Sequence, residues 1–451
     1  MEALFQKGSI LRKKKSLGAT LAASLIFFSC LIAYTFFINR NDTGFLITLF
    51  TVCFGCYLYA ATIDVERTKY WKWVGIGLRL VLFLGLPVLS DDYFRFIWDG
   101  RLLAAGINPF ESLPAGQLHQ GIDGINQELF DQLNSTAYFT IYPPLNQLIF
   151  WLSAWLFPGS IFGSMTVIRS CVFLADLGNY WLLQRLAIRY RLRPQVALLY
   201  FLNPLVILEF TGNLHFESVM IFFILLSIYW IDQKKTSLAG LAMALGVVSK
   251  LLPLMYMPAM MKFLSLRKLF IFYVITGIVV ILSFLPLISI DFLQGMSSSI
   301  DLYFRKFEFN ASVYFIARTI GYAITGYNAI SIIGPLMGVL TIGSMISYLV
   351  FNRHKVVTIA ETLLFTHLFY LLFATTVHPW YITTLLALSI LTRYRFAVVW
   401  SGLVFLTYIG YHAEGFSLPA WVLYLEYGVV FFWLLYEIIK KRELYPTNQP
   451  D

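Results

Sequence analysis

Apolar runs of about 20 residues recur along the whole chain, and no other feature of the sequence limits its fold as strongly. A run of this length is what an α-helix needs to cross the hydrocarbon core of a bilayer. Charged residues make up 13% of the 451 residues, whereas a soluble domain carries roughly 25%. We therefore predict an all-α, polytopic membrane protein that forms a single integral domain over residues 1–451, without a separate soluble domain.

The basic residues predict how the chain is oriented. The formal net charge is +9, and the basic residues cluster in short segments between apolar runs, as the positive-inside rule describes. Clusters at 12–15 and 440–442 place both termini in the cytoplasm. The charge is thus explained without nucleic acid, and we predict a multi-pass protein of the cell (inner) membrane whose surroundings are the lipid bilayer.

Applying the charge rule to each apolar run gives a bundle of about 12 to 14 transmembrane helices. The expected segments are three spans within 17–89, a large outer loop at 90–143, central spans within 144–289, a second outer loop at 290–310, and C-terminal spans with a short cytoplasmic tail within 311–451.

Three apolar pieces do not fit simple crossings. Residues 144–157 are too few for a comfortable span, so we expect them to be re-entrant or to lie along the outer leaflet. Residues 237–261 contain Lys250 and two prolines and are flanked by basic loops, which favours a broken helical hairpin. The piece at 311–326 remains ambiguous between crossing and lying at the interface.

This topology collects polar residues at the predicted outer face. Polar groups close to the hydrocarbon are costly, so their gathering indicates a site, although outer loops are also simply solvated. The residues are Asp91, Asp92, Asn213, His215, Glu217, Arg305, Lys306, Asn310, His378, Trp380 and Tyr381.

The acidic segment that begins at Ser90 has the clearest chemistry. Residues 91–105 have the spacing of an interfacial amphipathic helix, with Asp92, Arg95 and Asp99 on one face. That spacing is also typical of a salt-bridge ladder on a wet helix face. Asp91 stands where the third span meets water, and a carboxylate there can act as a general base or help to hold a divalent cation.

The stretch Ser90–Arg101, followed by Gly106–Phe110, resembles the first-loop signature of GT-C glycosyltransferases. The likeness is greatest to bacterial polyprenol-phosphate-mannose-dependent mannosyltransferases and extends over about residues 90–390. Further elements resemble that family in the same order, at Tyr142-Pro143-Pro144, Asn213–Glu217, Lys250 with Pro253 and Pro258, Phe309-Asn310, and His378–Tyr381. The order Asn213-Leu214-His215 and the three preceding spans depart from the commoner pattern.

The resemblance implies an inverting transfer of a sugar, mannose, from a polyprenyl-phosphate donor to a glycan, lipid or protein hydroxyl on the extracytoplasmic face. Asp91 would be the catalytic base, and Asp92 would orient the acceptor. No cofactor is required, and Asp91 and Asp92 would be the ligands if a divalent cation is used. The residues implied in substrate binding are Arg95, Asp99, Tyr142, Asn213, His215, Glu217, Lys250, Arg305, Lys306, Asn310, His378, Trp380 and Tyr381.

Two other classes of protein remain as alternatives. A secondary transporter also has broken helices, and Lys250 within an apolar run can serve as a coupling residue. Against a transporter, the sequence contains no inverted repeat. A lipid-linked polysaccharide polymerase or ligase shares the donor but usually carries its large outer loop late in the chain, whereas this loop comes early.

Overall fold

The computed structural model describes residues 16–293, 295, 297–298, 306–352, 357–412 and 415–440, and this part of the chain is mostly helical. The predicted fold class is therefore confirmed. The longer helices are α1 (Leu17–Phe37), α2 (Thr43–Leu58), α3 (Thr68–Leu82), α4 (Asp92–Ala104), α7 (Pro144–Leu156), α8 (Ile161–Arg189), α11 (Glu217–Asp232), α12 (Thr236–Val247), α13 (Leu266–Phe284), α15 (Val313–Thr325), α16 (Ile330–Phe351), α17 (Ile359–Phe373), α18 (Ile382–Ile390), α19 (Phe396–Leu403) and α20 (Ala420–Lys440).

Shorter elements connect these helices. They are α5 (Pro114–Gln117), α6 (Gln127–Asp131), α9 (Leu198–Phe201), α10 (Pro204–Val206), the π-helix η5 (Ile207–Gly212), the 3-10 helices η6 (Leu252–Tyr256), η7 (Pro258–Lys262), η9 (Pro379–Tyr381) and η10 (Val404–Gly410), and an antiparallel pair of short strands, β1 (Tyr411–His412) and β2 (Gly415–Phe416).

Among the described residues, six helices are long and apolar enough to cross a membrane, and a bent pair within 194–212 makes a seventh if it is counted as one span. The protein is thus a multi-pass membrane protein, but fewer helices pass this test than the 12 to 14 expected. The difference arises because several expected spans are short or broken. Residues 380–393, for example, contribute the end of the short 3-10 helix η9 and the nine-residue helix α18.

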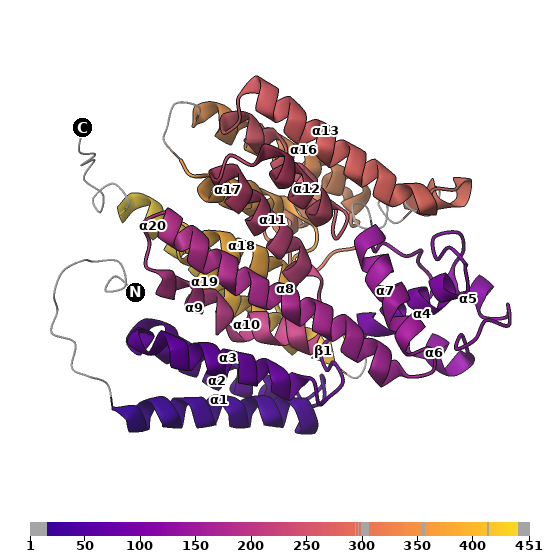
Figure 1. Cartoon of the computed structure of the whole chain (residues 1–451), viewed down its shortest axis with the longest axis horizontal. Coiled ribbons are helices and arrows are strands. Elements are labelled where there is room, and N and C mark those ends of the chain that lie inside the picture. The colour runs from indigo at the N-terminus through magenta and orange to yellow at the C-terminus, as the bar shows by residue number, and fades with distance from the viewer. Residues whose placement is uncertain are drawn as a thin grey trace.

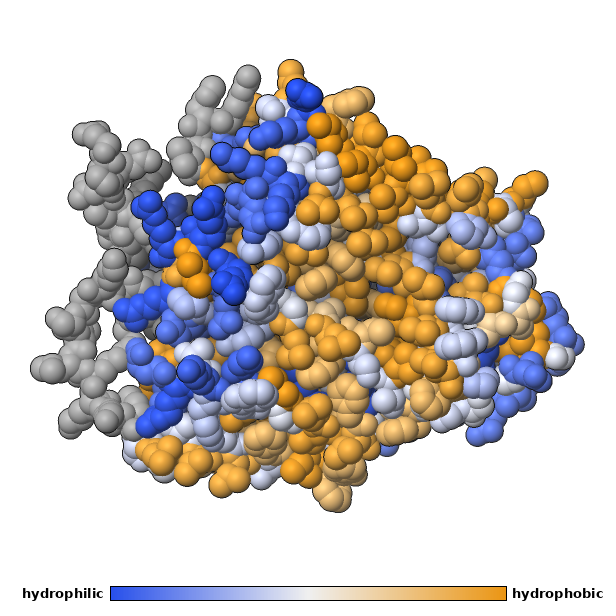
Figure 2. All heavy atoms as spheres, in the orientation of Figure 1, coloured by the Kyte–Doolittle hydropathy of each residue, from blue (hydrophilic) through white to orange (hydrophobic). Residues whose placement is uncertain are grey.

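Figure 1 shows the long helices running in broadly the same direction, with α4, α5 and α6 together beyond one end of the bundle. On the face that Figure 2 shows, apolar residues cover the middle of the molecule and hydrophilic residues gather at its two opposite ends. This is the surface of a bundle that crosses a bilayer, because only the two ends meet water. The 90–143 segment therefore lies at a membrane boundary.

The three ambiguous pieces are all short or interrupted in the structure. Helix α7 has 13 residues, which is shorter than a full span, and it packs against α4. Residues 236–262 divide into α12 and two 3-10 segments, so this piece is interrupted, and the hairpin stays a prediction. Helix α15 also has 13 residues, and it ends at Gly326 in the left-handed conformation (φ +76°).

The expected interfacial helix forms as α4, but most of its length is buried. Its Phe96 ring stacks on Phe150 of α7 with centroids 4.7 Å apart, and Phe150 meets Phe216 edge-on at 5.4 Å. These three rings join the 90–143 segment to the turn before α11. The start of α4 is therefore held against the membrane-crossing bundle by a dry aromatic contact.

Helices α4 and α7 approach so closely that one glycine is needed at their crossing. A methyl group at Gly100 would overlap the backbone carbonyl of Phe150. We predict that Gly100→Ala lowers the free energy of unfolding by about 1–3 kcal/mol, because the two helices must separate to admit the methyl group. Thermal unfolding of the purified protein in detergent measures this change.

Gly116→Ala is the matched control, since Gly116 lies in the same segment and its nearest neighbour, the Ser112 Cβ, is 3.8 Å from the added methyl position. Equal melting temperatures for the two variants would contradict the close packing of α4 on α7.

Candidate active site

Asp91 and Asp92 stand at the start of α4 and remain partly open to solvent. The Asp91 side chain is 37% exposed, and its Oδ2 lies 2.9 Å from Nη1 of Arg40. Asp92 accepts a hydrogen bond of 2.7 Å from the side-chain amide of Asn134. Both predicted catalytic carboxylates are therefore accessible at the boundary between the bundle and the 90–143 segment.

Arg95 and Asp99 have a different environment, because both side chains are buried. Arg95 Nε is 2.8 Å from Asp99 Oδ1, and the same guanidinium donates to the backbone carbonyls of Ser135 and Tyr138. Asp99 Oδ2 accepts hydrogen bonds from Thr140 at 2.5 Å and Gln147 at 3.0 Å. The structure thus places this pair inside the segment, where it ties α4 to residues 135–147.

Tyr142 belongs to the aromatic cluster beneath the acidic segment. Its ring meets Phe96 edge-on at 4.8 Å and Phe150 at 5.6 Å. Tyr142 is only partly buried, so its ring fills the space between α4 and α7 while part of it stays accessible.

The turn at residues 213–217 follows the π-helix η5, and π-bulges of this kind are frequent at functional sites. Leu214 takes a positive φ of 66°, which a leucine rarely adopts. The Asn213 side-chain oxygen accepts the backbone N–H of Leu89 at 3.0 Å. This bond connects the turn directly to the residues that lead into Asp91.

His215, His378 and Trp380 form one stack of rings. The His215 and Trp380 centroids are 3.7 Å apart, and those of Trp380 and His378 are 4.4 Å apart, with nearly parallel planes in both pairs. Phe309 extends the stack, since its ring lies 4.6 Å from His378. We call His215, Trp380, His378 and Phe309 the imidazole–aromatic stack.

Two nitrogen atoms in this stack lack a hydrogen-bond partner among the described residues, His215 Nε2 and His378 Nδ1. The His215 nitrogen is 3.3 Å from Glu209 Oε2 but is not aligned for a hydrogen bond. Burial lowers the pKa of His378 to about 3, so its ring is neutral at pH 7. A buried polar atom without a hydrogen bond costs free energy. We therefore expect a ligand or water to form hydrogen bonds with both of these nitrogens.

Lys250, Glu217 and Tyr381 meet beside the stack. The Lys250 ammonium pairs with the Glu217 carboxylate and lies 4.5 Å from the centre of the Tyr381 ring. The interrupted segment after α12 therefore brings Lys250 to this cluster. Its charge is already balanced by Glu217, which is nearly buried.

Asn310 is buried, and it positions the chain beside the stack. Its amide donates to Glu426 of α20 at 3.2 Å, and its carbonyl accepts a 2.5 Å bond from Tyr427. Phe309 bonds through its backbone to Thr375 and Val377. Lys306 is exposed at a turn, and Arg305 lies outside the described residues.

Two charged residues of this region were not predicted from the sequence. Glu209 is fully buried and accepts a 2.7 Å bond from Tyr408, and its place within an apolar span is a signal that marks functional residues. Arg40 lies in an ordinary short turn, so only the tertiary structure brings it to Asp91.

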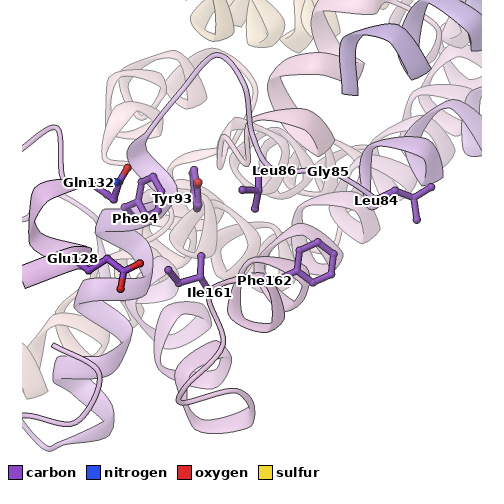
Figure 3. A pocket seen from close by; sticks show the side chains of 9 residues that line it. All are labelled: Leu84, Gly85, Leu86, Tyr93, Phe94, Glu128, Gln132, Ile161 and Phe162. Atoms are coloured by element: carbon purple, nitrogen blue, oxygen red, sulfur yellow. The ribbon is translucent and has the colours of Figure 1, made fainter. Parts of the chain in front are cut away.

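A groove lies beside the start of α4. Figure 3 shows Glu128 and Gln132 at one of its ends and Leu84 and Phe162 at the other. Leu84 and Leu86 are 65% and 51% exposed, so the apolar end of the groove opens where the bundle meets lipid. The lining residues are Leu84, Gly85, Leu86, Tyr93, Phe94, Glu128, Gln132, Ile161 and Phe162.

Within the described ranges, no group of three or more His, Cys, Asp or Glu side chains is arranged to hold a metal ion. The alternative role of Asp91 and Asp92 as ligands of a divalent cation stays a prediction.

A multi-pass bundle that gathers carboxylates, imidazoles and aromatic rings at one membrane boundary has the arrangement of a membrane-embedded enzyme for a polar substrate. Residues 46–265 match a family model described as the N-terminal domain of alpha-(1->6)-mannopyranosyltransferase. The matched residues, just under half of the chain, belong to this family of mannosyltransferases. No curated protein matches the chain.

The family match confirms the predicted glycosyltransferase class and mannose as the sugar, and it favours a transferase over a transporter, polymerase or ligase. The matched region includes the acidic segment, the turn at 213–217 and Lys250. It ends before Asn310 and His378, whose placement beside the same site comes from the structure.

The buried pair in α4 gives a prediction about stability. We expect Asp99→Ala to lower the free energy of unfolding by about 3–5 kcal/mol, because it leaves the Arg95 guanidinium buried without its partner. Hydrogen exchange should rise across residues 132–147, where the lost hydrogen bonds lie. Asp131→Ala is the control, since Asp131 is exposed and its side chain accepts a hydrogen bond from the exposed Gln127. Similar exchange in both variants would show that the pair does not hold the segment.

Proposed function

We propose that the protein transfers a mannosyl residue from a polyprenyl-phosphate donor to a hydroxyl acceptor on the extracytoplasmic face, with inversion at the anomeric carbon. The family supplies the sugar and the α-(1→6) linkage, which corresponds to a C6 hydroxyl of an acceptor sugar. The observation that carries the proposal is the accessible Asp91 carboxylate at the membrane boundary, in a segment whose other charged pair is buried.

Inversion requires one displacement. The acceptor oxygen forms a bond to the anomeric carbon, the bond from that carbon to the phosphate oxygen breaks, and polyprenyl phosphate leaves with the electron pair. Asp91 takes the proton from the acceptor hydroxyl and later returns it to solvent. Asp92 lies next to it and is oriented by Asn134, so it is placed to hold the acceptor.

The imidazole–aromatic stack supports binding of the sugar. Because His378 is neutral at pH 7, it suits a hydroxyl group better than an anion. The ring nitrogens of His215 and His378 that lack a hydrogen bond are buried, and sugar hydroxyls can form hydrogen bonds with them. Trp380 contacts both rings, and its main role in this arrangement is to hold them parallel.

The groove beside α4 supports a lipid-linked donor. Its apolar end is formed by exposed leucines next to the bilayer, and Tyr93 and Phe94 line it directly after the two carboxylates. A polyprenyl chain can lie along such a surface while its phosphate reaches the start of α4.

Asp91→Asn tests the proposed base. We expect the turnover number to fall about 10²- to 10⁴-fold, the contribution of a positioned general base, with the fold unchanged. The assay gives purified protein in lipid nanodiscs radiolabelled polyprenyl-phosphate mannose and acceptors with a free C6 hydroxyl. Asp131→Asn serves as a control for the loss of a carboxylate in the same segment. Turnover that survives Asp91→Asn would remove this residue as the base.

Cysteine labelling tests the proposed orientation. A cysteine replacing the exposed His119, in the 90–143 segment, should react with a membrane-impermeant maleimide in intact cells. A cysteine replacing the exposed Gln233, after α11, should react only after the cells are permeabilised. Both substitutions are made in a background without Cys30, Cys53, Cys56 and Cys171. The reverse labelling pattern would place the carboxylates in the cytoplasm.

A further inference from the structure

Arg40 lies in the turn between α1 and α2, outside the region that matches the family. Its Nη1 is 2.9 Å from Asp91 Oδ2, and its side chain is 31% exposed. The guanidinium carbon also lies 5.2 Å from the centre of the Tyr411 ring in β1. The first helical hairpin thus supplies a solvent-reachable cation in direct contact with the proposed base.

Among the described residues, three other cations near the site already have partners. Lys250 is paired with Glu217. Arg95 is buried against Asp99, and Arg169 is buried with bonds to the backbone carbonyls of Gly85 and Gly212. A leaving phosphate develops negative charge, and a fixed cation beside it lowers the barrier. Arg40 has both the charge and the exposure for that role.

The Arg40–Asp91 ion pair is weak enough for Arg40 to leave Asp91 and bind a phosphate instead. A single nitrogen of Arg40 contacts Asp91, whereas a guanidinium can hold a phosphate through two parallel hydrogen bonds. An ion pair at this exposure adds little to stability, so its loss is readily offset by the new bonds. While the pair persists, one oxygen of Asp91 is occupied and cannot accept a proton from the acceptor.

We propose that Arg40 binds the phosphate of the lipid-linked donor, and that its movement from Asp91 to this phosphate frees the carboxylate to act as the base. The inference rests on the proposed function. In the transfer, the bond between the anomeric carbon and phosphate oxygen breaks, the acceptor oxygen bonds to that carbon, and the acceptor proton passes to Asp91. Arg40 neutralises the polyprenyl phosphate that departs with the electron pair.

Equilibrium binding of polyprenyl phosphate, the sugar-free product, tests this exchange without turnover. Protein in phosphatidylcholine nanodiscs is compared as wild type, Arg40→Ala, Arg40→Lys, Arg40→Gln, Asp91→Asn and Arg40→Ala with Asp91→Asn. We expect Arg40→Ala to weaken binding about 10- to 100-fold, as loss of a charged hydrogen bond does, and Arg40→Lys to weaken it less. Asp91→Asn should tighten binding in the wild-type background and leave it unchanged in the Arg40→Ala background.

Arg318→Ala is the matched control. Arg318 pairs with Glu308, and the two side chains are 36% and 24% exposed, close to the exposure of the Arg40–Asp91 pair. Its removal should not alter polyprenyl phosphate binding. If Arg40→Ala does not fold, the Lys and Gln variants make the same comparison, with Lys expected to bind more tightly than Gln.

Unchanged affinity in the Arg40 variants would overturn the inference, and so would an Asp91→Asn effect of equal size in both backgrounds. Competition by phosphatidylglycerol in the nanodisc as strong as that by polyprenyl phosphate would also overturn it, because the site would then take bulk lipid headgroups. If Arg40→Ala transfers mannose with the KM for the donor of the wild type, the role of Arg40 is contradicted, whereas the proposed function is not. If polyprenyl phosphate binds in the expected pattern but no variant, including the wild type, transfers mannose, the phosphate site is supported and the proposed function is contradicted.

Discussion

The buried ion pair between Arg95 and Asp99 is the interaction on which the arrangement of the site depends. It satisfies two charges within α4 and at the same time bonds to residues 135–147, which return the chain to the membrane boundary. Those bonds fix the fold of the 90–143 segment, and the contact of Phe96 with Phe150 and Phe216 fixes this segment against the bundle. The position of Asp91, immediately before α4, follows from this anchoring and from the contact of Gly100 with α7.

The imidazole–aromatic stack is held together by contacts between aromatic rings rather than by ion pairs. His215 comes from the turn before α11, while Trp380 and His378 come from the segment before α18, and stacking brings them together. Asn310, bonded to Glu426 and Tyr427, places Phe309 against the same stack. Segments separated by more than a hundred residues thereby share one small volume, and two ring nitrogens remain available to a ligand.

The first helical hairpin also contributes a residue to the site. The turn that joins α1 and α2 places Arg40 on Asp91, and β1 places Tyr411 beside the guanidinium. The proposed exchange of Arg40 between Asp91 and a phosphate would link arrival of the donor to release of the base. Such coupling needs a weak, exposed ion pair, since a buried pair of the kind formed by Arg95 and Asp99 would be too costly to open.

The amino-acid sequence alone predicts a helical membrane protein, because about 20 consecutive apolar residues have few other stable environments. It also identified the acidic segment, the break near Lys250 and the group of polar residues expected at one boundary. Fewer helices reach the length of a full span than it predicts, since apolar composition does not reveal where π or 3-10 segments interrupt a helix. Only the tertiary structure decided that Arg95 and Asp99 are buried while Asp91 is open, and that Arg40 and Glu209 join the site. Those outcomes depend on contacts between distant segments, which helical spacing along one segment does not encode.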